Sequence, residues 1–310
     1  MKRVDKLNSL FNSKNPDDII EFYSKFKDTE ELINWSRNRP HGRAKIYEVN
    51  GKKDVIVVIP TADRFSKITK NCEKIFKGQH IIFVESAIND PYFKFARNSN
   101  IGLKYALRYK PKWILLSNDD VSKVDDIEVL LSELKKIDNR RIKLVYHDIS
   151  SEKYLYKQTA LLKLLKRLGF NAQRNPVKYS KKEFMKYRKD IYNLEKKFKI
   201  EYDFIYSSPL RRLLYKKIMP GTGGKSYFMI LSYYAVKNRR FDETFINDYE
   251  DMDFISRIKP SETTETSFRI NRYNHGGKNL GRGLDRRFRD ILNQAYLSYL
   301  VRKGRYGKIK

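Results

Sequence analysis

The chain has 310 residues, enough for one large domain or two smaller ones, and its 40% hydrophobic content with 22 tyrosines and 18 phenylalanines excludes a disordered protein. Its 66 basic residues outnumber 37 acidic ones, and the resulting net charge of +29 indicates an anionic partner. The single cysteine, Cys72, excludes an internal disulfide and a cysteine-based zinc site and fits a reducing compartment. Because the sequence shows neither a secretory signal nor an apolar run of about 18 residues, we expect a cytoplasmic protein, either soluble or peripheral at the cytoplasmic membrane face.

The first half of the chain predicts a helical segment followed by alternating strands and helices. Residues 1–53 are a predicted helical extension, in which Asn15 and Pro16 mark the start of a helix. Residues 54–61 follow as a nearly continuous β-branched run, typical of a strand buried on both faces. Further strands are predicted over 81–84 and 113–116, and further helices over 66–76, 100–109 and 124–137. This alternation predicts an α/β fold with a Rossmann-like, mostly parallel central sheet flanked by helices.

The middle and the end of the chain carry much of the positive charge. The segment from Lys153 to Pro220 holds 19 basic and five acidic residues, and we interpret about 150–220 as a basic helical insertion. A capping box at Ser180 opens a helix there. Its apolar seam recurs at steps of three and four residues: Phe184, Tyr187, Ile191, Leu194 and Phe198. Either this seam packs on the main domain while the lysines are solvated, which we favour, or the helix lies on an anionic membrane surface. Residues 284–310 predict a basic amphipathic helix and tail.

An amide and two carboxylates end the predicted strand over 113–116. Asn118, Asp119 and Asp120 follow this apolar run directly. In an open α/β sheet the carboxyl ends of the strands are where ligands bind. Carboxylate oxygens there suit Mg²⁺ or Mn²⁺, ions that proteins commonly share with substrate phosphates. The alternative is structural, because Asp and Asn are also preferred N-cap residues and these three could cap the next helix.

A second acidic cluster lies between Asp242 and Asp253. It holds six carboxylates in twelve residues, interleaved with aromatic and aliphatic side chains. This pattern favours partial burial over a solvated acidic loop, which is the alternative. Packed carboxylates repel one another unless cations or protons compensate, and a carboxylate whose pKa is raised in this way is a candidate general base.

Two glycine-containing segments flank the acidic cluster. Residues 221–225, Gly-Thr-Gly-Gly-Lys, form a flexible turn that does not have the spacing of a P-loop. Downstream, His275 precedes Gly276 and Gly277 and is a candidate ligand for a metal or a phosphate, although a lone histidine is more often structural.

Taken in order, these motifs resemble the inverting, family 2 nucleotide-sugar glycosyltransferases, which have the GT-A fold. The resemblance rests on Ile-Pro-Thr at 59–61, Asn-Asp-Asp-Val at 118–121, Phe-Asp-Glu at 241–243 and Glu-Asp-Met-Asp at 250–253, with His-Gly-Gly behind them. It covers about 54–138 and 220–282 and implies a GT-A catalytic domain over 54–283, interrupted by the basic insertion. Glu85-Ser86 departs from the family, which usually has an aspartate there, and the first position of the metal motif is Asn118.

The resemblance also implies roles for individual residues. Asp251, preceded by Glu250, matches the base that deprotonates the acceptor hydroxyl. Asp120 and His275 match positions that hold Mn²⁺ or Mg²⁺. The residues expected to bind the donor are Pro60, Thr61, Glu85, Asn100, Asn118 and Asp119.

The expected donor is a UDP-, GDP- or dTDP-sugar, and the expected acceptor is a hydroxyl of a lipid-linked molecule, a glycan or a protein. An anionic membrane surface is a further expected partner, whereas nucleic acid is not. Two alternatives remain open: a nucleic-acid-binding protein, suggested by the net charge of +29 and the many aromatic residues, and a sugar nucleotidyltransferase or sugar-nucleotide binder of GT-A type.

Overall fold

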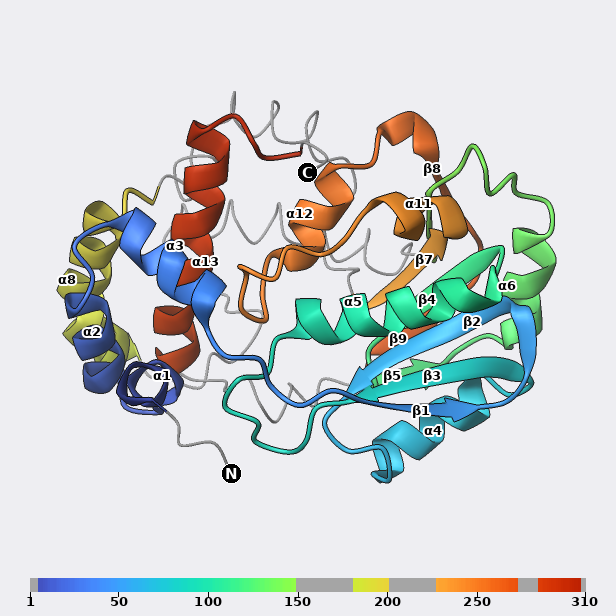
Figure 1. The fold of residues 1–310 in the computed structure, drawn as a ribbon, viewed down its shortest axis with the longest axis horizontal. Helices are drawn as coiled ribbons and strands as arrows, with labels where there is room; N and C mark the ends of the chain where they lie inside the picture. Colours follow the sequence, from blue (N-terminus) through green and yellow to red (C-terminus); the bar gives the residue numbers. More distant parts are fainter. Residues whose placement is uncertain (1–4, 149–180, 201–226, 273–283, 308–310) are drawn as a thin grey trace.

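The computed structural model describes residues 5–148, 181–200, 227–272 and 284–307 (Figure 1). Within this part of the chain, seven strands form one mixed sheet in the order β1-β3-β2-β4-β7-β6-β8, and β5 and β9 form a separate pair. The strands of the sheet are β1 (Lys45–Val49), β2 (Lys52–Thr61), β3 (Gln79–Glu85), β4 (Trp113–Ser117), β6 (Leu144–Tyr146), β7 (Phe228–Ser232) and β8 (Thr263–Glu265); the pair consists of β5 (Val121–Lys123) and β9 (Ile270–Arg272).

The prediction of a mostly parallel sheet is wrong for the sheet as a whole. Strands β3, β2 and β4 are parallel, as the alternation with helices required. However, β1 runs antiparallel to β3, and β7 runs antiparallel to both β4 and β6. Antiparallel neighbours need no helical crossover, so the helix–strand alternation on which the prediction rested gave no signal for them.

Two hydrophobic cores cover the two faces of the sheet. Helix α5 (Phe95–Ala106) packs on one face together with α11 (Tyr233–Asn238) and α12 (Glu250–Ser256). Helices α4 (Lys67–Ile75) and α6 (Ile127–Leu134) pack on the other face. Because both faces are covered, β3 and β4 are buried along their whole length, and their central residues are apolar without alternation.

Gly102 allows α5 to approach the sheet closely. A Cβ atom at this position would lie 2.4 Å from Cγ1 of Val58 and 2.8 Å from Cγ2 of Val84. Both distances are far below van der Waals contact, so only glycine fits between the helix and strands β2 and β3.

Five helices form a second body, the helical lobe, beside the sheet (Figure 1). It contains α1 (Lys6–Asn12), α2 (Pro16–Ser24), α3 (Thr29–Asn38), α8 (Lys181–Lys197) and α13 (Leu284–Arg302). Their apolar faces share one core, and the Tyr23 hydroxyl in α2 donates to the carbonyl oxygen of Phe288 in α13 at 2.7 Å. The N-terminal extension, the insertion helix and the C-terminal helix, which the sequence presents as three separate segments, therefore fold together.

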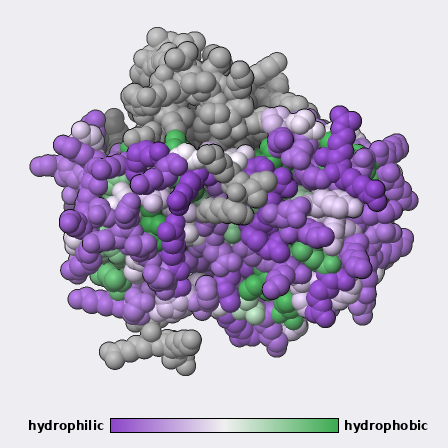
Figure 2. Space-filling view, turned by 45° about the horizontal axis from the view of Figure 1, so that its top comes forward, coloured by the Kyte–Doolittle hydropathy of each residue, from purple (hydrophilic) through white to green (hydrophobic). Residues whose placement is uncertain are grey.

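The seam of the insertion helix packs inside the protein, as favoured, but against the helical lobe and not against the main domain. Tyr187, Ile191, Leu194 and Phe198 of its seam are buried in the core of the helical lobe. The seam is therefore not available to a membrane. No helix in the described ranges is long and apolar enough to cross a membrane, and the face shown in Figure 2 is largely hydrophilic.

Candidate functional site

The carboxyl ends of the three parallel strands meet at one edge of the sheet. The β2–β3 register pairs Thr61 with Glu85, the last residue of each strand. The β2–β4 register ends at Val58 and Leu116, and β4 itself ends one residue before Asn118. The structure thus brings Thr61, Glu85 and Asn118–Asp120 to the same edge, as the sequence predicted.

Pro60 lies at the point where β4 separates from β2. It is buried and pairs with Val84 in β3. Because the ladder with β4 ends two residues earlier, at Val58, the missing N–H of Pro60 removes no hydrogen bond from that ladder. Proline can therefore occupy a central strand here, next to the candidate site.

Thr61 connects the end of β2 to the acidic motif that follows β4. Its hydroxyl donates to Oδ2 of Asp119 at 2.7 Å and lies 3.0 Å from the hydroxyl of Thr69. Burial raises the pKa of Asp119; the hydrogen bond from Thr61 lowers it, and the neighbouring Asp120 raises it. Asp119 is thus a half-buried carboxylate with a fixed position.

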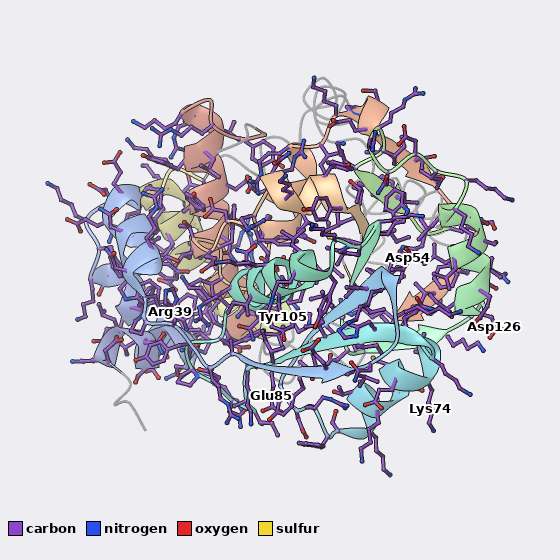
Figure 3. The ribbon with its side chains drawn as sticks, turned by 45° about the vertical axis from the view of Figure 1, so that its right-hand side comes forward. Arg39, Asp54, Lys74, Glu85, Tyr105 and Asp126 are labelled. Carbon is purple, nitrogen blue, oxygen red and sulfur yellow. The ribbon has the colours of Figure 1, made fainter. Side chains whose placement is uncertain are left out.

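Glu85 is held by two arginines that sequence reasoning missed. Its Oε1 lies 3.3 Å from a guanidinium nitrogen of Arg43, and its Oε2 accepts from the backbone N–H of Arg64 at 3.1 Å (Figure 3 labels Glu85). The buried carboxylate therefore anchors the loop that follows β2. Nothing in the sequence around Arg43 or Arg64 distinguishes them from the other basic residues.

Asp120 forms an ion pair with Arg272, the last residue of β9. The Nε of Arg272 lies 3.1 Å from Oδ1 and 2.9 Å from Oδ2 of Asp120. The side chain of Asp120 is 9% exposed and that of Arg272 is 39% exposed. Part of the guanidinium therefore remains open to solvent at the edge where the carboxyl ends of the parallel strands meet.

The donor set at this edge fits a divalent cation only in part. Within the described part of the chain, no group of three His, Cys, Asp or Glu side chains is arranged to hold a metal. Mg²⁺, however, is commonly bound by one or two carboxylates and completed by water and substrate phosphates. Asp119 and Asp120 fit such a site if Arg272 moves away from Asp120.

The helix-capping alternative for Asn118–Asp120 is wrong. Strand β5, not a helix, follows these residues, and Asp126 occupies the N-cap position of α6. The backbone N–H of Asn118 donates to the carbonyl oxygen of Tyr227 at 2.8 Å, and the Tyr227 hydroxyl donates to the carbonyl oxygen of Ile270 at 3.1 Å. The turn is thus held by residues near β7 and β9 and does not serve a helix end.

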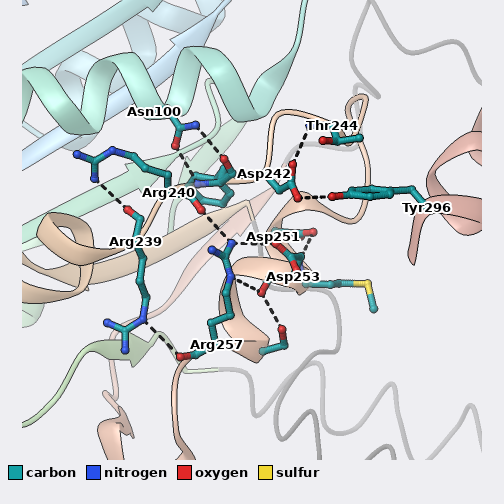
Figure 4. Close-up of polar contacts among 12 residues, drawn as sticks. Asn100, Arg239, Arg240, Asp242, Thr244, Asp251, Asp253, Arg257 and Tyr296 are labelled. Carbon is teal, nitrogen blue, oxygen red and sulfur yellow. Dashed lines mark hydrogen bonds and ion pairs between the residues drawn. The ribbon is translucent and has the colours of Figure 1, made fainter. Parts of the chain in front are cut away.

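Asn100, expected at the donor, uses its amide to position the acidic cluster. Its Nδ2 donates to the carbonyl oxygen of Phe241 at 3.0 Å and to Oε1 of Glu243 at 2.9 Å. Its Oδ1 accepts from the backbone N–H of Phe241 at 2.9 Å (Figure 4). The described contacts therefore tie Asn100 to the Phe-Asp-Glu segment and not to Thr61 or Glu85.

The acidic cluster is compensated by Tyr296 from the distant α13 and by the nearby Arg257, and is not a solvated loop. Asp242 Oδ2 accepts from the Tyr296 hydroxyl of α13 at 2.6 Å, which links the cluster to the helical lobe (Figure 4). Asp253 and Arg257 form a buried ion pair at 2.8 Å. Such pairing is what a packed set of carboxylates requires.

Glu250 and Asp251 begin α12 and differ in environment. Glu250 is 5% exposed, and its Oε2 has no hydrogen-bond partner among the described residues. Burial, together with the charges of Asp251 and Asp248, raises the pKa of Glu250 well above its ordinary value. Asp251 is half-buried, and its Oδ1 accepts from the backbone N–H of Met252 at 2.7 Å. Burial thus raises the pKa of Glu250, whereas the carboxylate of Asp251 is the more exposed to solvent of the two.

Asp248 of the acidic cluster lies close to Asp290 of α13. Asp248 pairs with Arg286 at 3.1 Å. Burial and the charge of Asp248 raise the pKa of Asp290 to about 7, although Arg286 and Arg287 lower it. These groups adjoin a hollow of about 350 Å³ between α1, α13 and the 246–247 turn.

His275 and the glycine-rich segments at 221–225 and 276–277 lie outside the described residues. The chain matches none of the protein-family models, none of the curated proteins and none of the solved structures with which it was compared. The assignment of a function therefore depends on the residues and the geometry described above.

Proposed function

We propose that the protein is a metal-dependent inverting glycosyltransferase of GT-A type that moves a sugar from a nucleoside-diphosphate donor to an acceptor hydroxyl. The observation that carries this proposal is the 2.7 Å hydrogen bond from Thr61 to Asp119. It joins the ends of two parallel strands directly beside Glu85 and Asp120, at the edge where α/β sheets bind nucleotides.

The base and ribose of the donor would lie at the ends of β2 and β3, beside Pro60, Thr61 and Glu85. Two apolar side chains in the loops after these strands support this placement, because Phe65 is 67% exposed and Ile88 is 53% exposed. Exposed apolar surface next to a buried carboxylate suits a nucleobase, which offers a flat face and polar edges.

The diphosphate would lie at the end of β4. Asp119 and Asp120 would hold Mn²⁺ or Mg²⁺, with His275 as a further ligand by resemblance, and the ion would neutralise charge on the leaving diphosphate. Arg272 would leave Asp120 when the site is filled, and its guanidinium would then be free to contact phosphate oxygens.

Asp251 would accept the proton of the acceptor hydroxyl as this attacks the anomeric carbon and the diphosphate leaves. A single displacement of this kind inverts the configuration at that carbon. Glu250 supports this role because burial raises its pKa and so favours its neutral form, and a neutral neighbour would spare Asp251 a second negative charge at the start of α12. The acceptor belongs to a lipid-linked, glycan or protein class.

Turnover is tested by ³¹P NMR of the protein with UDP-, GDP- and dTDP-sugars and Mn²⁺, with water and simple glycosides as acceptors. We expect one nucleoside diphosphate to accumulate, with Asp251→Asn and Asp120→Asn reducing its rate. Pyrophosphate formed from a nucleoside triphosphate would instead identify a nucleotidyltransferase. Donor binding without turnover under any condition would favour a sugar-nucleotide binder.

A further inference from the structure

Helix α8 has three faces with different surroundings. Its apolar seam is buried against the helical lobe. On one flank, Lys197 Nζ donates to the carbonyl oxygen of Tyr23 in α2 at 3.1 Å. On the other flank, Glu195 pairs with Arg287 of α13 at 2.9 Å. These contacts orient the helix, so the side opposite the seam must face outward, as α8 does at the margin of Figure 1.

This outward side, the outer stripe, combines exposed cations with exposed apolar side chains. It consists of Met185, Arg188, Lys189, Tyr192 and Lys196, spaced at i, i+3, i+4, i+7 and i+11 on one helix face. Met185 is 51% exposed and Tyr192 is 63% exposed, two of the few large apolar side chains exposed in the described chain. The three cations form no ion pair with any described residue, and the stripe contains no acid.

We propose that the outer stripe of α8 docks the protein on a membrane surface that carries anionic lipid. Unpaired arginine and lysine side chains would meet lipid phosphates, while Met185 and Tyr192 would enter the boundary between headgroups and acyl chains. Tyrosine is well suited to this boundary because its ring is apolar and its hydroxyl is polar. The proposal is independent of the proposed function.

The arrangement favours a membrane over a nucleic acid. A single-stranded nucleic acid is typically held in a basic groove that follows its backbone. The outer stripe instead lies along one straight helix of 17 residues on the outside of the lobe, which suits contact with a flat surface. The apolar side chains between the cations would strengthen binding to a lipid surface. Binding to the phosphates of a nucleic acid would not require them.

The test is cosedimentation of the full chain with phosphatidylcholine vesicles, with and without phosphatidylglycerol. The combined variant Arg188→Gln, Lys189→Gln and Lys196→Gln should bind anionic vesicles about 100-fold more weakly, since each cation near such a surface contributes about fivefold. The matched control removes three exposed lysines from the α4 side of the sheet: Lys70→Gln, Lys74→Gln and Lys77→Gln. Figure 3 shows Lys74 far from the helical lobe, so this control lowers net charge equally and should bind nearly as the parent does.

A second variant, Met185→Ser with Tyr192→Ser, tests the apolar component and keeps every charge. We expect about tenfold weaker vesicle binding and unchanged binding of a single-stranded RNA oligonucleotide. The proposal is overturned if the parent fails to sediment with anionic vesicles. It is also overturned if the α8 and α4 charge variants weaken equally, or if the serine variant affects RNA and not vesicles. All changes lie at exposed positions, and matching thermal unfolding will verify that the variants fold.

Discussion

Removal of the guanidinium of Arg272 should expose the carboxylate of Asp120 at the edge of the sheet where the parallel strands end. Arg272 contacts both carboxylate oxygens of Asp120, and the aspartate side chain is 9% exposed while the arginine is 39% exposed. The pair therefore lies between exposed ion pairs, worth less than about 1 kcal/mol, and buried pairs, whose disruption costs about 3–5 kcal/mol. We expect Arg272→Ala to lower the free energy of unfolding by about 1–2 kcal/mol in EDTA, a fall in Tm of about 2–4 °C.

Divalent cations should reverse this loss. Without Arg272, no described side chain competes with a metal for Asp120, so Mn²⁺ should raise the Tm of Arg272→Ala more than that of the parent. A matched control is Arg269→Ala, since Arg269 forms a similar ion pair with Asp125 at 2.8 Å but does not contact Asp120. Its Tm should respond to Mn²⁺ as the parent does.

The assay is thermal unfolding in EDTA and in a series of Mn²⁺ concentrations. In a double-mutant cycle, Arg272→Ala should cost less in an Asp120→Asn background, because the carboxylate left unpaired is then absent. Equal Mn²⁺ responses from the parent, Arg272→Ala and Arg269→Ala would refute the competition between Arg272 and a metal. An unchanged Tm in EDTA would show that the ion pair contributes nothing to stability.

Three further changes test other parts of the structure. Asp251→Asn should slow donor turnover by at least about 100-fold, whereas Glu250→Gln should retain it because the raised pKa of Glu250 favours its neutral form, which Gln resembles. The opposite ranking in ³¹P NMR would make Glu250 the base. Since the pKa of Asp290 is raised to about 7, the folded state binds the extra proton between about pH 4 and about pH 7, and stability is lost as the pH rises through that window. The free energy of unfolding, measured in urea at a series of pH values, should therefore fall less between about pH 4 and about pH 7 for Asp290→Asn than for the parent, by at most about 4 kcal/mol. An identical pH dependence in the two proteins would mean that Asp290 titrates normally. Gly102→Ala would place Cβ 2.4 Å from Val58 and should destabilise the protein by about 1–3 kcal/mol in urea, with partial recovery in a Val58→Ala background, whereas an unchanged midpoint would mean that α5 can shift freely.

Elements with strong local signals could be predicted from the sequence. Strand β2 contains a continuous apolar run from Val55 to Pro60, and α2 and α4 begin at side-chain caps, Asn15 and Ser66. Helix α5 begins at Phe95, five residues before the predicted start. The N-cap residue Lys94 makes no side-chain cap hydrogen bond. Instead, the backbone N–H of Phe95 at the start of the helix donates to Oδ1 of Asn247 at 2.7 Å, a partner 152 residues away in the sequence. Sequence patterns cannot reveal a partner supplied by tertiary structure.

The short strands were missed for a related reason. Strands β5, β6, β8 and β9 have three residues each, too few for a periodic pattern. Strand β1 lies within the predicted helical extension because its pairing with β3 is supplied by a later segment.

The candidate site was only partly visible in the sequence. Asn118–Asp120 were found because they follow a buried strand directly, whereas Thr61 and Glu85 were assigned to the donor site through the family resemblance. Arg272, Arg43 and Arg64 were not, since single arginines among 66 basic residues carry no local signature. Only the fold shows that Arg272 pairs with Asp120, that Arg43 pairs with Glu85, and that the backbone N–H of Arg64 donates to Glu85.

The most direct test of the donor site is a thermal-shift panel of UDP, GDP and dTDP and their sugar conjugates, each measured with Mn²⁺, with Mg²⁺ and with EDTA. Asp120→Ala is measured beside the parent. We expect one nucleotide to raise the Tm of the parent in a metal-dependent manner and to leave the Tm of Asp120→Ala unchanged. The absence of any nucleotide-dependent shift, or an equal shift in both proteins, would contradict a nucleotide-sugar site at the carboxyl edge of this sheet.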